Sequence, residues 1–195
     1  MRAKQRIALF GSLKAMTMAA MLTAMSVVIG IFCKNFLNFG AGPYAGLFRI
    51  TFENLPILAA GLMFGPVVGA AAGLSADLIS YLLSRQVYPI NPLVTLGAMA
   101  IGLISGLMAH YVIKHPGKLR IIVACAMAHL VGSMIIKPLG LYQFYGVAVL
   151  WRIPLYMAIA PVEIAILCLL YRNRMVRAFI DHHTTGGKHE HQRGA

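Results

Sequence analysis

Six long apolar runs constrain the fold of this 195-residue chain more than any other feature. They lie at about 15 to 33, 53 to 64, 67 to 83, 93 to 113, 119 to 136 and 151 to 171. A helix that crosses a membrane needs about 20 mostly apolar residues. Only 11% of the residues are charged, whereas a soluble domain has about 25%. We therefore predict an all-α membrane protein in which six transmembrane helices form one bundle.

The basic residues predict the orientation of that bundle. The chain has 17 Lys and Arg against 5 Asp and Glu, and with six spans 12 of the basic residues fall on the side of the two termini. Cytoplasmic segments collect Lys and Arg, so both termini are predicted to be cytoplasmic in a multi-pass protein of the cell membrane. The membrane accounts for this charge without nucleic acid. The chain then divides into a basic arm at 1–14, a six-helix domain at 15–171 and a polar basic tail at 172–195, which we expect to be disordered.

The connections on the outer side are the longer ones. They run at about 34 to 51, 84 to 92 and 137 to 150, whereas only Gly65 and Pro66 join the second and third runs. The second run is short for a span, so we expect its helix to begin near Phe48. Binding residues concentrate on elaborated loops, and this predicts a ligand site on the outer side.

Motifs of soluble enzymes are missing from the sequence. It contains no P-loop of the form GxxxxGK[ST], no HExxH and no GxSxG. Cys33, Cys125 and Cys168 lie far apart and form no CxxC pair, which favours packing over a disulfide framework or a zinc site. We expect no enzymatic activity, no cofactor and no metal.

Asp77, His129 and Glu163 lie inside the predicted spans at a similar depth. Ionisable groups within a bilayer usually face the interior of a bundle and mark function. Three interpretations remain open: a proton relay, a metal site with one nitrogen and two oxygen ligands, and a structural polar cluster.

Small residues repeat at four-residue spacing. Ala20 and Ala24 follow Ala15 and Ala19, and we expect all four to line one side of the first helix. Such a side lets another helix approach closely, either within the bundle or in a separate membrane subunit. For the glycines of later helices we favour packing within the bundle. These are Gly61, Gly65, Gly69, Gly73, Gly102 and Gly106.

Two arginines are candidates for binding an anionic ligand. Arg49 precedes Glu53 by four residues, so the two can pair on one helix face. Arg152 follows Trp151 at the start of the sixth run. A guanidinium beside aromatic rings suits a ligand with carboxylates and a planar heterocycle. A snorkelling arginine in an aromatic belt explains the same pattern equally well.

Three segments resemble one known family. They are FRITFENLPILAAGLMFGPVVGAAAGLSADLISYLL from Phe48 to Leu83, YPINPLVTLGAMAIGLISGL from Tyr88 to Leu107, and WRIPLYMAIAPVE from Trp151 to Glu163. Together with AAMLTAMSVVIG in the first helix, they are similar to the substrate-capture (S) subunits of energy-coupling-factor (ECF) vitamin transporters, and most closely to the folate group. The resemblance extends from about Ala15 to Leu170.

The resemblance implies a six-helix substrate-binding membrane subunit of an ATP-driven importer. Such a subunit opens to the outside and docks on a transmembrane scaffold that carries two cytosolic ATPases. Ala20 and Ala24 match the docking helix, and Arg49, Asp77 and Arg152 match charged positions of the folate group. Where many members of that group have a PGFT-like start of the fourth helix, this chain has Asn91 to Thr95.

On this basis we predict a site for folate or a related pterin-glutamate. Arg49 and Arg152 would bind carboxylates, Asn91 would hydrogen-bond polar edges, and Asp77 would complete the charged set. Trp151, Phe48 and Tyr88 would supply stacking or walls. One alternative keeps the family and changes the ligand to another small vitamin or modified base. Two others are a stand-alone proton-coupled transporter and an intramembrane enzyme, both using Asp77, His129 and Glu163.

Overall fold

A computed structural model of the chain describes residues 13–39, 49–83, 90–113, 117–173 and 176–177. Within them the chain is helical and has no strand, apart from an isolated antiparallel bridge between Asn38 and Arg49. This confirms the all-α prediction. The α-helices are α1 (Leu13–Phe36), α2 (Asn54–Phe64), α3 (Pro66–Leu83), α4 (Pro92–Leu107), α5 (Lys118–Ala128), α6 (Lys137–Tyr145) and α7 (Arg152–Leu170). The ends of the predicted arm and tail, at 1–12 and 178–195, lie outside the described residues.

Four helical segments of the described chain are long and apolar enough to cross a membrane, by length and composition. They are Ala15–Phe36, Pro66–Leu83, Pro92–Val112 and Lys118–Leu170. The last has 53 residues, which at about 1.5 Å per residue is more than twice the thickness of a bilayer core. It therefore folds back on itself, and the reversal lies in the 3₁₀-helical turn Gly146–Trp151. The number of spans and the cytoplasmic position of the termini remain predictions.

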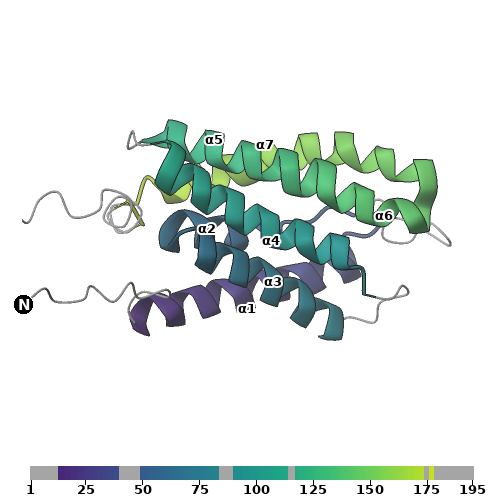
Figure 1. Ribbon diagram of the computed structural model, residues 1–195, viewed down its shortest axis with the longest axis horizontal. Helices are drawn as coiled ribbons and strands as arrows, with labels where there is room; N and C mark the ends of the chain where they lie inside the picture. Colours follow the sequence, from purple (N-terminus) through teal and green to yellow (C-terminus); the bar gives the residue numbers. More distant parts are fainter. Residues whose placement is uncertain (1–12, 40–48, 84–89, 114–116, 174–175, 178–195) are drawn as a thin grey trace, which may run out of the picture.

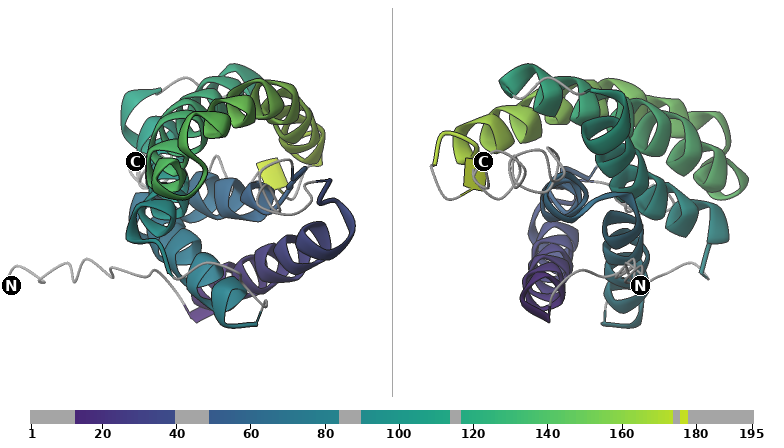
Figure 2. Two further views of the ribbon diagram at one scale, coloured as in Figure 1. Left: turned by 90° about the vertical axis from the view of Figure 1, so that its right-hand side faces the viewer. Right: turned by 60° about the vertical axis from the view of Figure 1, so that its left-hand side comes forward.

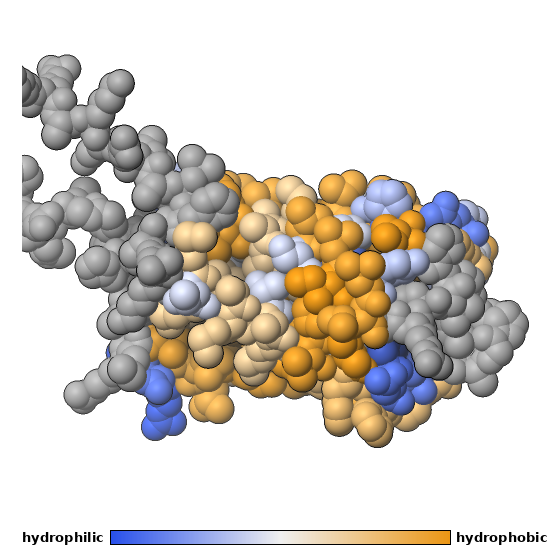
Figure 3. Space-filling model, turned by 90° about the horizontal axis from the view of Figure 1, so that it is seen from below, coloured by the Kyte–Doolittle hydropathy of each residue, from blue (hydrophilic) through white to orange (hydrophobic). Residues whose placement is uncertain are grey.

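The helices form one bundle with α4 near its middle (Figures 1 and 2). α4 contacts α2 and α3 on one side and α5 and α6 on the other, while α1 packs against α2 and α3. The start of α1 and the end of α7 lie at the same end of the bundle (Figure 1). Hydrophobic side chains cover much of the surface seen from below, and the strongly hydrophilic ones lie toward the two ends (Figure 3). That distribution suits a helix bundle in a bilayer.

Glycines hold α2, α3 and α4 together at backbone distance. A Cβ at Gly61 would lie 2.5 Å from the carbonyl oxygen of Gly102, and a Cβ at Gly69 would meet the same oxygen and lie 2.7 Å from the Cα of Gly61. A Cβ at Gly106 would lie 2.5 Å from the backbone nitrogen of Pro66. Because no side chain fits these contacts, the prediction that these glycines pack within the bundle is confirmed for these four.

Two predicted boundaries are wrong. α2 begins at Asn54 and not near Phe48, because Ile50 donates its N–H to the carbonyl of Leu37 at 3.2 Å and the chain from 49 to 53 is not helical. The expected outer loop from Lys137 to Leu150 is α6 followed by the 3₁₀ turn. Pro138 does not stop this helix, because a π-helical stretch (His129–Ile136) precedes it and changes the hydrogen-bonding pattern at that point.

Candidate functional site

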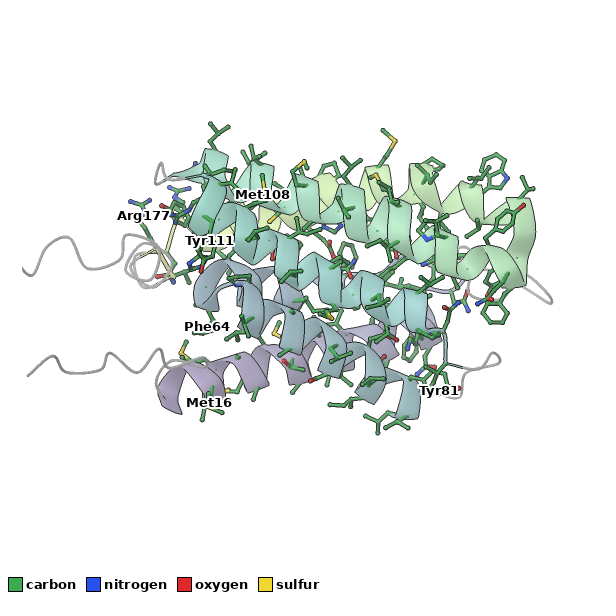
Figure 4. All side chains as sticks on the ribbon, in the orientation of Figure 1. Met16, Phe64, Tyr81, Met108, Tyr111 and Arg177 are labelled. Atoms are coloured by element: carbon green, nitrogen blue, oxygen red, sulfur yellow. The ribbon has the colours of Figure 1, made fainter. Side chains whose placement is uncertain are left out.

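A cluster of charged side chains lies at the end of the bundle that Tyr81 marks in Figure 4. The guanidinium of Arg49 lies 3.4 Å from Oε1 of Glu53, which confirms that the two pair, although not on a helix face as predicted, because both precede α2. Nζ of Lys137 lies 3.9 Å from the same oxygen. Glu53 immediately precedes α2. Burial raises the pKa of its carboxyl, but Arg49, Lys137, Lys34 and Arg152 outweigh burial and hold this pKa at about 2. Glu53 is therefore a charged carboxylate among cations at neutral pH.

Lys137 and Lys34 are the cations of this cluster that the sequence did not predict as site residues. Lys137 is 4% exposed, and its Nζ donates a 3.0 Å hydrogen bond to Oδ1 of Asn54, the first residue of α2. Gly97 of α4 makes room for its stem, since a Cβ there would lie 2.6 Å from Cγ of Lys137. A lysine that the sequence analysis assigned to an outer loop thus reaches the interior of the bundle. Gly97, which leaves room for it, is the one sequence feature that could have indicated this position.

Arg152 points into the bundle. It is 5% exposed, and its Nη2 donates to the hydroxyl of Tyr156 at 3.0 Å, with the guanidinium carbon 5.5 Å from the centre of the same ring. Trp151 beside it is 65% exposed. The two neighbours therefore face different surroundings, and the buried guanidinium is not in the position of a snorkelling side chain.

A narrow cavity adjoins the cluster, and its interior of about 10 Å³ has room for about one water molecule. Ser26, Glu53, Asn54, Ile57, Ala76, Asp77, Ser80, Ala98 and Lys137 line it. Oδ2 of Asp77 accepts a 2.7 Å hydrogen bond from Thr95, and Nζ of Lys34 donates to Ser80 at 2.7 Å. The cavity therefore combines small apolar walls with a few fixed polar groups, as ligand sites usually do.

The side chain of Asn91 makes hydrogen bonds within the protein. Its Oδ1 accepts from the backbone N–H of Leu93 at 3.0 Å, which caps the start of α4, and its Nδ2 donates to the carbonyl of Gly140 in α6. Its predicted contact with a ligand stays a prediction. Phe48 and Tyr88 lie outside the described residues.

His129 and Glu163 form a buried pair of their own. Nε2 of His129 lies 2.8 Å from Oε2 of Glu163, and neither residue is exposed. Asp77 accepts a hydrogen bond from Thr95. Among the described residues no three His, Cys, Asp or Glu side chains come close enough to hold a metal ion. The metal site among the three interpretations is therefore wrong, and the pair connects the helical segment from α5 to α6 with α7.

Comparison with known proteins assigns the family. Residues 14–181 match the family described as ECF transporter, substrate-specific component. This chain belongs to that family. The predicted role as a substrate-capture subunit of an ECF transporter is thereby confirmed.

Two solved structures share the fold of this substrate-specific component. A crystal structure of FolT bound with folic acid has 23% sequence identity and a TM-score of 0.63, over 84% of this chain and 95% of that chain. The S component of a bacterial ECF transporter has 26% identity and a TM-score of 0.58, over 84% of this chain and 96% of that chain. The comparison with curated proteins gave no match.

The small residues of α1 in this substrate-specific component lie on two different faces. Ala15 and Ala19 are buried, whereas Ala20 and Ala24 are exposed. The expectation that all four line one side is wrong, because a helix turns about 100° per residue and so separates Ala19 from Ala20. Ala20 and Ala24 instead share a face with the exposed Val28.

Proposed function

We propose that this substrate-specific component binds folate or a related pterin-glutamate from the outer side of the cell membrane. In this proposal six helices span the membrane, both termini are cytoplasmic, and the chain has no enzymatic activity. The fold likeness to FolT bound with folic acid supports this ligand. The observation that carries the proposal is the charge of the cluster beside the cavity.

The cluster holds more cations than it can neutralise itself. Arg49, Lys137, Lys34 and Arg152 act on Glu53, and Asp77 is a second carboxylate in the wall of the same cavity. Four cations against two carboxylates leave a surplus of two positive charges. Charges away from water are costly unless they are paired. Folate carries two carboxylates on its glutamate, so one bound molecule supplies the missing charge. Bidentate ion pairs with Arg49 and Arg152 are the geometry that guanidinium groups favour with carboxylates.

Delivery of the ligand requires partners in this proposal. The chain would dock on the ECF transmembrane scaffold through the exposed face of α1 that carries Ala20 and Ala24, and two cytosolic ATPases would supply the energy. Small residues on an exposed helix face let a second helix approach closely in lipid. Neither Ala20 nor Ala24 would contact the ligand.

The first experiment is mass spectrometry of the small molecule that co-purifies with the protein, followed by titration with folic acid. We expect a pterin-glutamate in the extract and saturable binding of folic acid to the purified chain. A different vitamin in the extract, together with no binding of folic acid, would replace the ligand and keep the family.

A transport assay tests which energy source drives uptake. ATP-dependent uptake in cells should survive collapse of the proton gradient. Uptake that needs the gradient and not ATP would instead support a proton-coupled transporter. For that alternative, the residues to test are the buried pair His129 and Glu163 and, separately, Asp77, which accepts a hydrogen bond from Thr95.

A further inference from the structure

The cavity contains a buried hydrogen-bond donor that the protein does not use. Asn54 has no exposed surface and lines the cavity, and its Nδ2 has no hydrogen-bond partner among the described residues. Buried polar groups are nearly always paired, and an unpaired one costs free energy. An acceptor on a bound ligand would satisfy this donor.

Lys137 fixes which end of the Asn54 amide is left without a hydrogen-bond partner. An ammonium group can only donate hydrogen bonds, so the group that it contacts at 3.0 Å must be the amide oxygen. The amide NH2 is therefore the group left over. Glu53 lies 3.9 Å from the same ammonium and helps to hold it in place. Gly97 supplies the space through which the Lys137 side chain passes α4.

The surroundings of Asn54 favour an uncharged acceptor over a carboxylate. The charge of Lys137 is shared with Glu53, and the walls beside the amide include Ile57, Ala76 and Ala98. We propose that Asn54 is a specificity-determining residue whose NH2 donates to a carbonyl oxygen on the heterocycle of the ligand, and that Lys137 is the positioning residue that orients it. This inference rests on the proposed function, because the heterocycle is taken to be a pterin.

The test compares two ligands that differ at the 4-position of the ring and in the hydrogen on the neighbouring N3. Folic acid carries a 4-oxo group on its pteridine ring, and aminopterin carries a 4-amino group there, which donates and does not accept. Both are titrated against the purified full-length protein in detergent, and the ratio of the two dissociation constants is the readout. The ratio does not change when part of a sample is inactive, so it separates recognition from folding.

We expect the unmodified protein to prefer folic acid by about tenfold or more, because a site built around a donor rejects a ligand without the matching acceptor. Asn54→Asp replaces the donor with an acceptor of the same shape, so the ratio should move toward aminopterin by at least about tenfold. Asn54→Leu should bring the ratio close to one. Lys137→Met keeps the stem and removes the ammonium, which frees the amide to turn over, so the ratio should again fall toward one. The exposed Lys118, changed to Met, is the control and should leave both affinities as they are.

Each other result overturns a defined part of the inference. If Asn54→Asp and Asn54→Leu keep the original ratio while folic acid still binds, Asn54 does not read the heterocycle and the proposed function stands. If only Lys137→Met keeps the ratio, its positioning role is refuted. If the unmodified protein binds folic acid and aminopterin equally, the inference fails and the proposed function stands. If it binds neither ligand, the proposed ligand and this inference fail together.

Discussion

Replacing Arg152 with alanine is the sharpest test of the proposed carboxylate site. The side chain is 5% exposed and is held by the 3.0 Å hydrogen bond to the hydroxyl of Tyr156. A ligand carboxylate that reaches this guanidinium forms a charge-assisted bond shielded from water. Truncating one partner of such a pair typically costs about 2 to 5 kcal/mol of binding free energy. At about 1.4 kcal/mol per tenfold, Arg152→Ala should weaken folic acid binding by about 30-fold to several thousand-fold.

Two further variants separate the guanidinium from its surroundings. Arg152→Lys keeps the positive charge but loses the planar fork, so it should recover only part of the affinity. Tyr156→Phe removes the hydroxyl that orients Arg152 and leaves the guanidinium itself. We expect it to weaken binding far less than Arg152→Ala, because the charge that the carboxylate needs is still present.

The assay is titration of each purified variant with folic acid and with 6-hydroxymethylpterin, which has the pterin ring but no carboxylate. Arg152→Ala should reduce the preference for the glutamate-bearing ligand, because the lost contact is with a carboxylate. Thermal unfolding without ligand reports any general damage. An unchanged preference in Arg152→Ala, measured on folded protein, would remove Arg152 from the site and refute the reasoning.

Four further predictions test the role of the chain, its docking face, its packing and its charge. Proteoliposomes that contain only this chain should bind folic acid but show no ATP-dependent accumulation, and uphill transport by the chain alone would contradict the assignment of separate ATPase subunits. Ala20→Trp and Ala24→Trp should abolish uptake in cells and leave binding nearly intact, since both residues are exposed. The matched control is Leu82→Trp, at an exposed position of α3, and equal loss of uptake in the control would argue against docking through α1. Gly69→Val should destabilise the protein by about 1 to 3 kcal/mol or more, because its new carbons meet the backbone of α2 and α4, and an unchanged melting temperature would contradict the contact. The ordinary pKa of a glutamate is 4.5 and that of Glu53 is lowered to about 2, so the stability from its ion pairs should be fully present above about pH 5 and be lost as the pH falls from 4.5 toward 2. Melting temperatures measured across that range should depend on pH less steeply in Glu53→Gln, and identical curves would refute the pairing.

The sequence predicted the helical class because length and hydropathy carry that information directly. Apolar runs report burial in lipid or protein, and each of the described α-helices coincides with such a run except α6. The pairing of Arg49 with Glu53 was also predictable, since both residues belong to one short segment. Contacts within a few residues depend on local geometry alone.

The rest of the site depends on contacts between distant parts of the chain. Lys137 forms a hydrogen bond with Asn54, which lies 83 positions earlier in the chain. Nothing in the sequence around either residue indicates this contact. A lysine followed by Pro138 and Gly140 has the composition of a loop. The packing of the bundle overrides that preference, so the lysine that composition assigns to solvent becomes a buried part of the cavity wall.

The glycine contacts among α2, α3 and α4 make these helices a stiff block, and Gly97, Gly132 and Gly140 join the helical segment from α5 to α6 to this block at similarly close range. Helices that touch through their backbones have no side chains between them to change rotamer, so these three helices behave as a fixed block. That block carries Asn54, Asp77 and Thr95, whereas Lys137 lies in α6 and Arg152 begins α7. Distances measured from α2 to α4 should therefore stay constant when a ligand binds.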